Sequence, residues 1–534
     1  MSFSDITNEI VSEFLQTVVV LDDESYLREP ESEAESNSEI IDPSPRGNIG
    51  GTDDENQNSR PPSKKHGLDA KILIDSFANN GQVCAVLAPA HNEDPVKYTK
   101  NVAQNADVVI LDWQINGDDG EIAQTIIKDL IQEDSNRGGR LRLFVIYTGE
   151  GDLTIPYESV RDKIKILEEI DGDKVVLGCN NIRVKFVMKK DGEDPQGISE
   201  KELPNVIIQT FAEFAGGLVP NSVMAAIHQV RENAQHVLQR FRKELDGAFI
   251  AHRILLHNQE EASRYLIELI ADELKATFDY SSLIEKSVGQ EVLTEYITDG
   301  VYPCDKLLIK ETAEFEEQKF IELKKEDVIT SLDTNVFDET LWKKTKTLYK
   351  RIYPLFHQDT QVGRERYLEL SRISSLRTEI NSQLRTVIPQ IKLGSILRTK
   401  TTEDYYVCLQ PLCDCVRLEP NKKNPFIFGK FKESIKPNQP FELVINDDNK
   451  NICLSFRHEP FATKVFNFGS NETACIIPQK EGDKWFFTPS GNTKLIWIAE
   501  LRPVFAQRLV HRIMSQLSRV GLDEFEWQRL HGNG

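Results

Sequence analysis

The sequence lacks long hydrophobic runs, and no stretch approaches the roughly 18 apolar residues that a membrane-spanning helix needs. The first residues, MSFSDITNEIVSEF, lack the basic start and continuous apolar core of a signal peptide. Cysteine is scarce, with 8 in 534 residues, which is not the composition of a small disulfide-stabilised secreted protein. We therefore expect a cytoplasmic protein with reduced thiols and no contact with a membrane.

The sequence also lacks a net positive charge. The formal net charge is −21, whereas a protein that binds nucleic acid broadly needs a basic surface to displace counterions. The one basic helical stretch, VRENAQHVLQRFRKEL, is more typical of a solvated or pairing face than of a DNA reader. No helix-turn-helix, Walker or nuclease motif is present, so we expect no nucleic-acid partner.

The N-terminal 216 residues show short apolar runs that alternate with helical periodicity, which predicts a doubly wound parallel sheet of five strands. An acidic segment rich in Ser, Pro, Gly and Asn interrupts this pattern, and we expect residues 28–66 to be a disordered insertion. The expected strands are Thr17–Leu21, 84–89, 106–113, 141–149 and a hairpin, DKVVLG followed by IRVKFVMKK, that turns at Asn180 and Asn181; the expected helices are 3–15, 68–80, 94–105, 120–134, 157–169 and 200–216.

The rest of the chain changes character twice. Residues 217–390 have long charged amphipathic stretches and predict a region that is almost all helical. Residues 391–534 contain short apolar or aromatic runs separated by turn residues, and then one helix at 504–520. We therefore expect three domains along the chain: an α/β domain at 1–216, a helical region at 217–390, and a β-rich α+β domain at 391–534.

Polar residues stand where four of the expected parallel strands end. Asp22 and Asp23 follow TVVVL, Asp112 ends ADVVILD, Thr148 ends LFVIYT, and Lys189 lies near the end of VKFVMKK. Parallel sheets bind ligands at the carboxyl ends of their strands, so these side chains are expected to converge. Three carboxylates can share one rim if a hard cation, for which we predict Mg²⁺, lies between them. An acidic pair after a strand is, by itself, more often a loop start or helix cap.

This pattern resembles the receiver domain of two-component response regulators, whose fold is flavodoxin-like. VVVLDDE matches the first strand and its acidic pair, and YTG matches the hydroxyl residue with a small residue behind it. VVILDWQINGDDG matches the phospho-acceptor strand, with Gly120 eight positions after Asp112. Phe186 stands three positions before Lys189, as the aromatic residue of the family does, which favours Lys189 over Lys190 as the functional lysine.

Two departures from the family concern the loops around the site. Lys190 stands where the family has a proline after its lysine. Gln114, Ile115 and Asn116 replace the proline and methionine that are common in the loop after the acceptor. These changes leave the reactive groups in place but put the loop geometry and the lifetime of the phosphoryl group in question.

The resemblance implies a role for each residue in phosphoryl transfer, where a protein mostly positions groups and neutralises charge. Asp112 is the expected phospho-acceptor, with Thr148 and Lys189 contacting phosphoryl oxygens. Asp22, Asp23, Asp112 and the backbone carbonyl of Gln114 are the expected Mg²⁺ ligands. Thr148 and Phe186 form the expected switch pair.

Two functions compete for the whole chain. The first is a phosphate sink: a response regulator that accepts phosphoryl groups from a cognate histidine kinase, in competition with a second response regulator, as in the buffer proteins of bacterial anti-phage two-component systems. The second is an effector whose C-terminal region carries an unrecognised enzymatic or binding activity. We expect no enzymatic activity beyond self-phosphorylation from a phosphodonor and slow hydrolysis of the aspartyl phosphate, and a homodimer through the helical region is a further hypothesis.

Cysteine and histidine clusters suggest other chemistry less strongly. Cys408, Cys413 and Cys415 have only irregularly spaced later partners, so buried strand thiols are favoured over a zinc site. A phosphotransfer histidine would suit the helical region, but ordinary histidines are favoured because no relay motif surrounds them. The candidates are His228, His236, His252 and His257.

Overall fold

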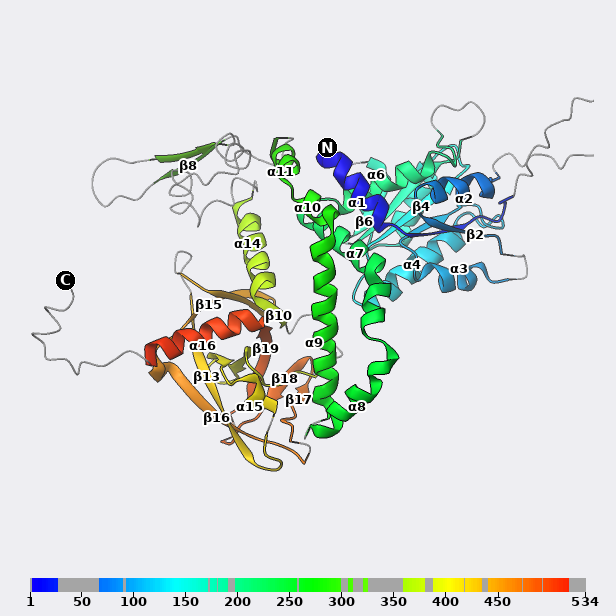
Figure 1. Cartoon of the computed structure of the whole chain (residues 1–534). Helices are drawn as coiled ribbons and strands as arrows, with labels where there is room; N and C mark the ends of the chain where they lie inside the picture. The colour runs from blue at the N-terminus through cyan, green and yellow to red at the C-terminus, as the bar shows by residue number, and fades with distance from the viewer. Residues whose placement is uncertain are drawn as a thin grey trace, which may run out of the picture. The chain divides into compact units, whose positions relative to one another are not determined.

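The computed structural model describes residues 2–26, 67–89, 93–170, 173–179, 181–190, 197–256, 259–298, 306–310, 320–324, 359–379, 388–416, 418–434, 440–472, 474–491 and 493–517. The chain divides into two compact units (Figure 1), the first comprising Met1–Arg231 with Ser281–Val292 and the second Glu232–Tyr280 with Leu293–Gly534. The predicted insertion at 28–66 and His257 lie outside the described residues. No described helix is long and apolar enough to cross a membrane.

A seven-stranded sheet forms the centre of the first unit. Its strands are β1 (Thr17–Leu21), β2 (Val83–Leu87), β3 (Val108–Leu111), β4 (Arg142–Thr148), β5 (Glu168–Ile170), β6 (Asp173–Cys179) and β7 (Ile182–Met188). They lie in the order β2-β1-β3-β4-β7-β6-β5, and the first five run parallel. This confirms the predicted doubly wound parallel sheet. β6 and β5 extend it in antiparallel fashion beyond β7, and β6–β7 is the predicted hairpin.

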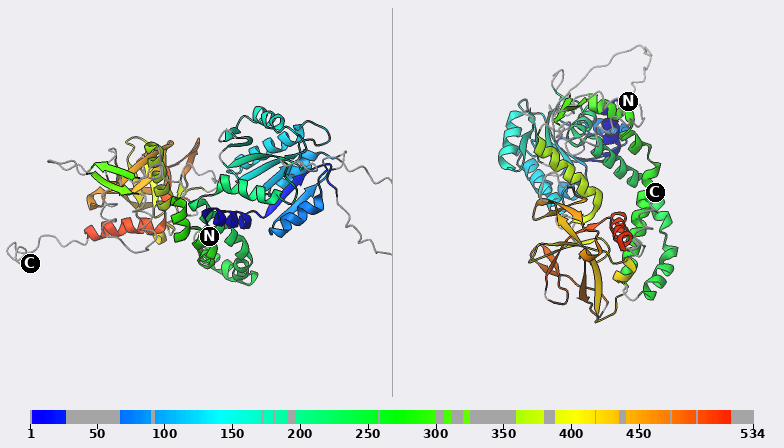
Figure 2. Two further views of the ribbon diagram at one scale, coloured as in Figure 1. Left: turned by 90° about the horizontal axis from the view of Figure 1, so that it is seen from above. Right: turned by 90° about the vertical axis from the view of Figure 1, so that its left-hand side faces the viewer.

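Helices cover both faces of this sheet (Figure 2). Apolar side chains of α1, α2 and α6 form one core with the sheet, and those of α3, α4 and α5 form the other. The bounds are α1 (Phe3–Phe14), α2 (Ala70–Asn79), α3 (Pro95–Ala103), α4 (Glu121–Asn136), α5 (Thr154–Lys163) and α6 (Leu203–Ala215). Because both faces are buried, the parallel strands are continuous apolar runs rather than alternating ones.

The predicted helix at 157–169 is wrong at its C-terminal end. α5 ends at Lys163, and β5 follows at Glu168–Ile170. Ile164 leaves the helical conformation with φ −111° and ψ 75°, and both Ile164 and Leu167 are buried in the core below the sheet. Burial of these two side chains overrides the local helical periodicity.

The first unit also extends past the predicted boundary at residue 216. Met224 and Ala225 of α7 (Leu218–Arg240) are buried in the core of α1 and α6, and so is Val292. The short helix α10 (Ser282–Ser287) belongs to this unit as well. Two hydrogen bonds support this packing: a buried one from Asn221 Nδ2 to Thr7 Oγ1 at 2.9 Å, and a partly buried one between Ser222 Oγ and Ser287 Oγ at 2.8 Å.

The second unit is less helical between 217 and 390 than predicted, because β8 and β9 pair as an antiparallel hairpin and β10 joins the C-terminal sheet. The helices there are α8 (Asp246–Leu255), α9 (Glu260–Ala276) and α14 (Thr360–Ser375), with 3-10 turns η1 (Lys243–Leu245) and η2 (Thr277–Tyr280); the strands are β8 (Lys306–Lys310), β9 (Phe320–Lys324) and β10 (Leu376–Glu379). Helix α11 (Gln290–Tyr296) begins in the first unit and ends in the second.

The predicted β-rich C-terminal region is a ten-stranded sheet with a largely aromatic core. Phe426, Phe428, Phe466 and Phe468 pack edge-on or tilted against one another, and α16 packs its apolar face on the same core. Besides β10, the elements are β11 (Ser395–Thr399), β12 (Tyr405–Cys408), α15 (Leu412–Val416), β13 (Lys423–Glu433), β14 (Leu443–Asp447), β15 (Lys450–Phe456), η6 (Pro460–Ala462), β16 (Thr463–Gly469), β17 (Gln479–Glu481), β18 (Lys484–Phe487), β19 (Leu495–Leu501) and α16 (Pro503–Leu517).

Candidate functional site

The carboxyl edge of the parallel sheet gathers the predicted residues. Asp22 follows β1, Asp112 follows β3, Thr148 ends β4 and Lys189 follows β7. Backbone hydrogen bonds continue the strand pairing to this edge: the amide of Asp112 donates to Leu21 O at 2.9 Å, and the amide of Lys189 donates to Thr148 O at 2.7 Å. All four side chains are at least nine-tenths buried.

Three carboxylates meet at this edge. Asp22, Asp23 and Asp112 each offer an oxygen, and these oxygens lie within 4.8 Å of one another. Backbone amides hold the three side chains in place: Glu24 N–H donates to Asp22 Oδ1 at 2.9 Å, Asn116 N–H donates to Asp23 Oδ2 at 2.9 Å, and Trp113 N–H donates to Asp112 Oδ1 at 2.8 Å. The cluster is therefore built by the backbone of two loops.

One ammonium group faces the three carboxylates. Lys189 Nζ lies 2.6 Å from Asp22 Oδ2 and 3.3 Å from Asp112 Oδ2. Burial raises the pKa of Asp112 to about 6, the charge of Asp22 adds to this, and Lys189 opposes it. Burial opposes the charge of Lys189 itself, but Asp112 and Asp22 outweigh it and hold the pKa of the lysine above its ordinary value.

The cluster fits a divalent cation. Asp23 Oδ1 is buried and has no hydrogen-bond partner in the structure, although a buried carboxylate oxygen needs one. One ammonium cannot balance two buried carboxylates and a third that is half-buried, and oxygen ligands suit hard cations such as Mg²⁺. Among the described residues this is the only group of three or more His, Cys, Asp or Glu side chains placed to hold a metal.

A comparison with protein-family models decides what this fold and site belong to: residues 14–194 match the model of the response receiver domain. The first unit contains a receiver domain. No curated protein and no solved structure matches the chain. The receiver domain gives the chain the phospho-acceptor function of a response regulator, with a histidine kinase or another phosphodonor as its partner. The receiver match ends before α6, so it does not extend to the second unit.

Thr148 and Phe186 lie on neighbouring strands of the receiver but in different surroundings. Thr148 Oγ1, at the carboxyl edge, accepts a hydrogen bond from Glu150 N–H at 3.1 Å. Phe186 pairs with Ile146, two residues before Thr148 on β4. It is buried in the core, where its ring packs edge-on against Tyr157 with ring centroids 5.6 Å apart. Of the predicted switch pair, Thr148 therefore lies at the site and Phe186 packs against α5.

The loop after the acceptor is tightly built despite its departures from the family. Gln114 Nε2 donates to Asp119 Oδ1 at 3.1 Å and to Glu150 Oε1 at 3.0 Å. Gly120 caps the N-terminus of α4 with φ +84°, and a Cβ there would lie 2.3 Å from the Trp113 ring. Only glycine therefore allows Trp113 to pack beneath the loop. Trp113 and Glu150 were not among the predicted site residues.

Two further residues near the lysine were also missed. Tyr147, directly before Thr148, donates its hydroxyl hydrogen bond to Ile198 O at 2.7 Å, and its ring centroid lies 5.7 Å from Lys189 Nζ. The sequence signal for Tyr147 is its position in YTG, directly before Thr148. Ile198 carries no sequence signal, because it approaches the site only through the tertiary fold.

The alternative cysteine and histidine sites differ from the acidic cluster. Cys408 and Cys415 are buried in the aromatic core of the second unit, and Cys413 is exposed. Burial raises the pKa of Cys408 well above its usual range, and hydrogen bonding with Cys415 adds to this, which favours inert thiols. His228, on α7 of the first unit, contacts the Glu13 carbonyl through Nδ1 at 2.9 Å, at the end of α1.

Proposed function

We propose that Asp112 is the phospho-acceptor of this receiver. An oxygen of Asp112 would attack the phosphorus of a kinase phosphohistidine, so that a P–O bond forms while the P–N bond breaks and the imidazole leaves. The observation that carries this assignment is the cluster of three carboxylates, those of Asp22 and Asp112 buried and that of Asp23 half-buried with one unpartnered oxygen, beside Lys189. Such a charge imbalance disfavours folding and is typical of functional sites.

The other residues would position and neutralise the phosphoryl group. Asp22, Asp23, Asp112 and the Gln114 carbonyl would hold Mg²⁺, which when bound neutralises charge on the carboxylates and the phosphoryl oxygens. Lys189, now paired with two carboxylates, would turn one hydrogen bond to a phosphoryl oxygen, and Thr148 Oγ1 would donate to another.

The test is labelling of the full-length protein with Mg²⁺ and acetyl phosphate or a phosphorylated kinase. We expect one acid-stable, base-labile acyl phosphate, and Asp112→Asn should abolish it because an amide does not attack. Thr402→Val, a substitution in the second unit, is the control that should retain the label. Label persisting on Asp112→Asn would contradict the assignment.

For the whole chain we propose a phosphate sink in a bacterial two-component pathway, with a defensive pathway as the setting. The support is the absence of any recognised output motif in the sequence and the net charge of −21, which opposes a nucleic-acid output. A sink competes with a second response regulator for the same phosphohistidine. Asp112→Ala should then increase signalling and slow growth without a stimulus, and disabling the kinase histidine should restore growth.

The ten-stranded domain favours a second candidate, an effector. It is a folded domain with its own aromatic core rather than a short tail, and such a domain can carry a binding or enzymatic activity of its own. The two candidates predict opposite results for Asp112→Ala: an effector would lose its output, and growth would stay normal while the response disappears.

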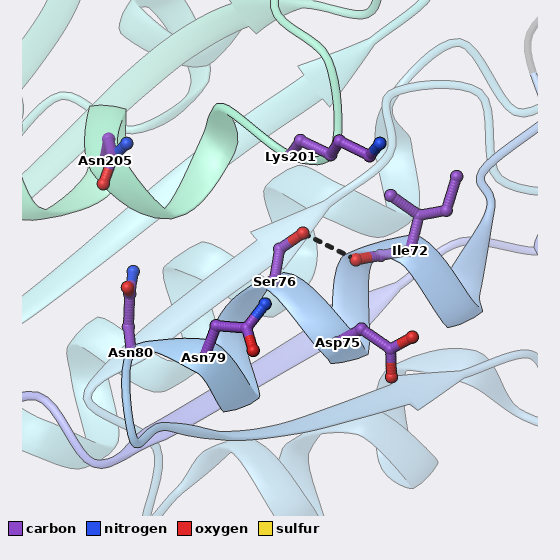
Figure 3. Close-up of a pocket in the computed structure, with 7 residues that line it drawn as sticks. All are labelled: Ile72, Asp75, Ser76, Asn79, Asn80, Lys201 and Asn205. Carbon is purple, nitrogen blue, oxygen red and sulfur yellow. Dashed lines mark hydrogen bonds between the residues drawn. The ribbon is translucent and has the colours of Figure 1, made fainter.

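We also propose the docking surface for the phosphodonor, a groove of about 490 Å³ between α2 and the start of α6 (Figure 3). The residues just before each helix pair with residues just after strands that end at the site, Asp69 with Tyr26 and Ile198 with Lys189. The end of the groove at the start of the two helices therefore lies toward the carboxyl edge. The lining is rich in hydrogen-bonding side chains, as expected for a transient interface. The lining residues are Ile72, Asp75, Ser76, Asn79, Asn80, Lys201 and Asn205.

A substitution that fills the groove separates docking from chemistry. Ser76→Arg should slow phosphoryl transfer from the kinase at least several-fold and leave labelling by acetyl phosphate unchanged. Ser135→Arg, at an exposed position of α4, is the matched control that should change neither rate. Equal slowing with both donors would show that Ser76→Arg perturbs the site, not docking.

A further inference from the structure

The segment after Lys189 is held by a backbone bridge. Lys190 N–H donates to Ile198 O at 3.1 Å, and Ile198 N–H donates to Met188 O at 2.9 Å, so Ile198 pairs in parallel with Lys189. The family proline could not form the first of these bonds, because it has no N–H. Lys190 therefore fixes by hydrogen bonding the backbone that a proline would fix by its ring.

Gly197 makes this close approach possible. A Cβ at Gly197 would lie 2.5 Å from Lys190 Cα and 2.8 Å from Lys189 O, which is closer than side-chain atoms can approach backbone. Gly197 is itself buried. The bridge therefore leaves little room for the backbone of Lys189 to move.

Tyr147 joins this bridge from the neighbouring strand. Its hydroxyl donates to the same Ile198 carbonyl that Lys190 uses, at 2.7 Å, and a carbonyl oxygen can accept both bonds. The side chain is 2% exposed. Burial, and then the charges of Glu200 and Asp22, raise the pKa of Tyr147, so the hydroxyl keeps its proton and stays a donor.

We propose that Tyr147 is a positioning residue for Lys189. Its hydroxyl holds the Ile198 carbonyl and hence the backbone of Lys189 and Lys190, while its ring, 5.7 Å from the ammonium, lies beside the path of the lysine side chain. Tyr147 would act only through the lysine, since Thr148, its neighbour on β4, is the residue that faces the phosphoryl group. This inference rests on the proposed function of Lys189.

A double-mutant cycle on the full-length protein tests it. With Mg²⁺ and acetyl phosphate, Tyr147→Phe should lower the rate of acyl phosphate formation about three- to tenfold, the size expected for one lost positioning hydrogen bond. Lys189→Met should lower the rate further. In the Lys189→Met background, Tyr147→Phe should change the rate less than about twofold, because the group it positions is gone. Gly197→Ala should act in the same direction as Tyr147→Phe.

The controls separate positioning from general stability. Tyr405→Phe removes another buried tyrosine hydroxyl, which donates to Asp447 Oδ2 at 2.9 Å in the second unit, and it should leave the rate unchanged. Amide hydrogen exchange at Lys190 and Ile198 should be faster in Tyr147→Phe than in the wild type, and this readout needs no phosphorylation.

Each outcome has a distinct meaning. An unchanged rate in Tyr147→Phe, or an equal fall with and without Lys189, would overturn the positioning role and leave the phospho-acceptor function standing. A wild-type protein that takes no label, together with faster exchange in Tyr147→Phe, would overturn the proposed function and with it the catalytic meaning of the bridge. Unchanged exchange at both amides would overturn the bridge itself.

Discussion

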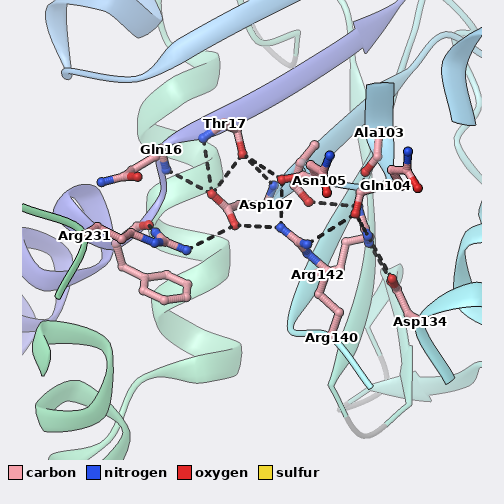
Figure 4. A network of polar contacts seen from close by, with 12 residues as sticks. Gln16, Thr17, Ala103, Gln104, Asn105, Asp107, Asp134, Arg140, Arg142 and Arg231 are labelled. Carbon is pink, nitrogen blue, oxygen red and sulfur yellow. Dashed lines mark hydrogen bonds and ion pairs between the residues drawn. The ribbon is translucent and has the colours of Figure 1, made fainter. Parts of the chain in front are cut away.

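Two buried charged clusters lie at opposite edges of the receiver sheet, and they are built differently. At the amino edge, Arg142 is fully buried and uses all five of its N–H donors: two on Asp134, at 2.7 and 2.9 Å, and three on carbonyls at the end of α3 (Figure 4). At the carboxyl edge, three carboxylates share one ammonium. The first cluster is saturated, whereas the second leaves Asp23 Oδ1 without a partner.

Asp107 shows the same saturation at the amino edge. Its Oδ2 accepts from the amides of Gln16 and Thr17 and from Thr17 Oγ1, while its Oδ1 faces Arg140 at 3.3 Å and Arg231 at 3.9 Å. These contacts connect the starts of β1 and β3 with α7 (Figure 4). Saturated buried charge can fix the register of strands, whereas unsaturated buried charge leaves free energy available for a ligand. The amino edge therefore has the features of a cluster that stabilises the fold, and the carboxyl edge has those of a ligand-binding site.

The largest expected effect is loss of the guanidinium at the amino edge. Arg142→Met should destabilise the protein by about 3–5 kcal/mol, because Asp134 would stay buried without a partner and three carbonyls would lose their donor. Chemical denaturation of the full-length protein, followed by a probe of the first unit, measures this. Arg140→Met is the control, since that side chain is 31% exposed, and it should cost less than about 1 kcal/mol.

At the carboxyl edge, removing a charge should raise the free energy of unfolding rather than lower it. Asp112→Asn should stabilise the Mg²⁺-free protein by about 1–3 kcal/mol at pH 7, because it removes one of the two buried carboxylates of the cluster and leaves Lys189 paired with Asp22. The raised pKa of Asp112, which burial causes first, points the same way. Unfolding in the presence of a chelator measures the effect. Destabilisation of the same size as in Arg142→Met would remove the distinction between the two edges.

Mg²⁺ should stabilise the protein through the carboxyl edge alone. At a concentration ten times its dissociation constant, Mg²⁺ should stabilise the wild type by about 1.4 kcal/mol, since it binds only the folded site. Asp23→Asn should lose most of this gain, because it replaces the carboxylate whose oxygen is unpartnered. Arg140→Met should keep the gain in full. Unfolding with and without Mg²⁺ measures both, and an equal gain in Asp23→Asn would place the cation elsewhere.

The two edges also differ in how well sequence reasoning predicts them. Asp22, Asp23, Asp112 and Lys189 were predictable because each stands at the end of an apolar run, and a parallel topology brings such ends together. Arg142 and Asp134 were not, since one reads as the first residue of a strand and the other as part of a solvated helix face. Their pairing depends on how α4 packs, which no local pattern records.

The misplaced boundaries have the same origin. β5 was predicted as helix because the periodicity of 157–169 is helical, and the burial of Ile164 and Leu167 overrides it. The first unit continues to Arg231 and regains Ser281–Val292, because apolar residues far along the chain complete its core. Sequence reasoning thus predicted the five parallel strands and the acidic cluster, which depend on local patterns, and missed features that depend on tertiary burial.

The smallest expected effect tests the redundancy of the amino edge. Thr17→Val keeps the β-branched shape but removes a hydroxyl that donates to Asp107 Oδ2 at 3.1 Å and accepts from Asp107 N–H at 3.1 Å. The Asp107 carboxylate would keep the amides of Gln16 and Thr17 and the charge of Arg140. We therefore expect a loss of only about 0.5–1.5 kcal/mol and no change in the rate of acyl phosphate formation. A loss of stability as large as that of Arg142→Met would show that the Asp107 contacts act as one unit. A changed rate of acyl phosphate formation at unchanged stability would mean that the amino edge takes part in the chemistry of the carboxyl edge.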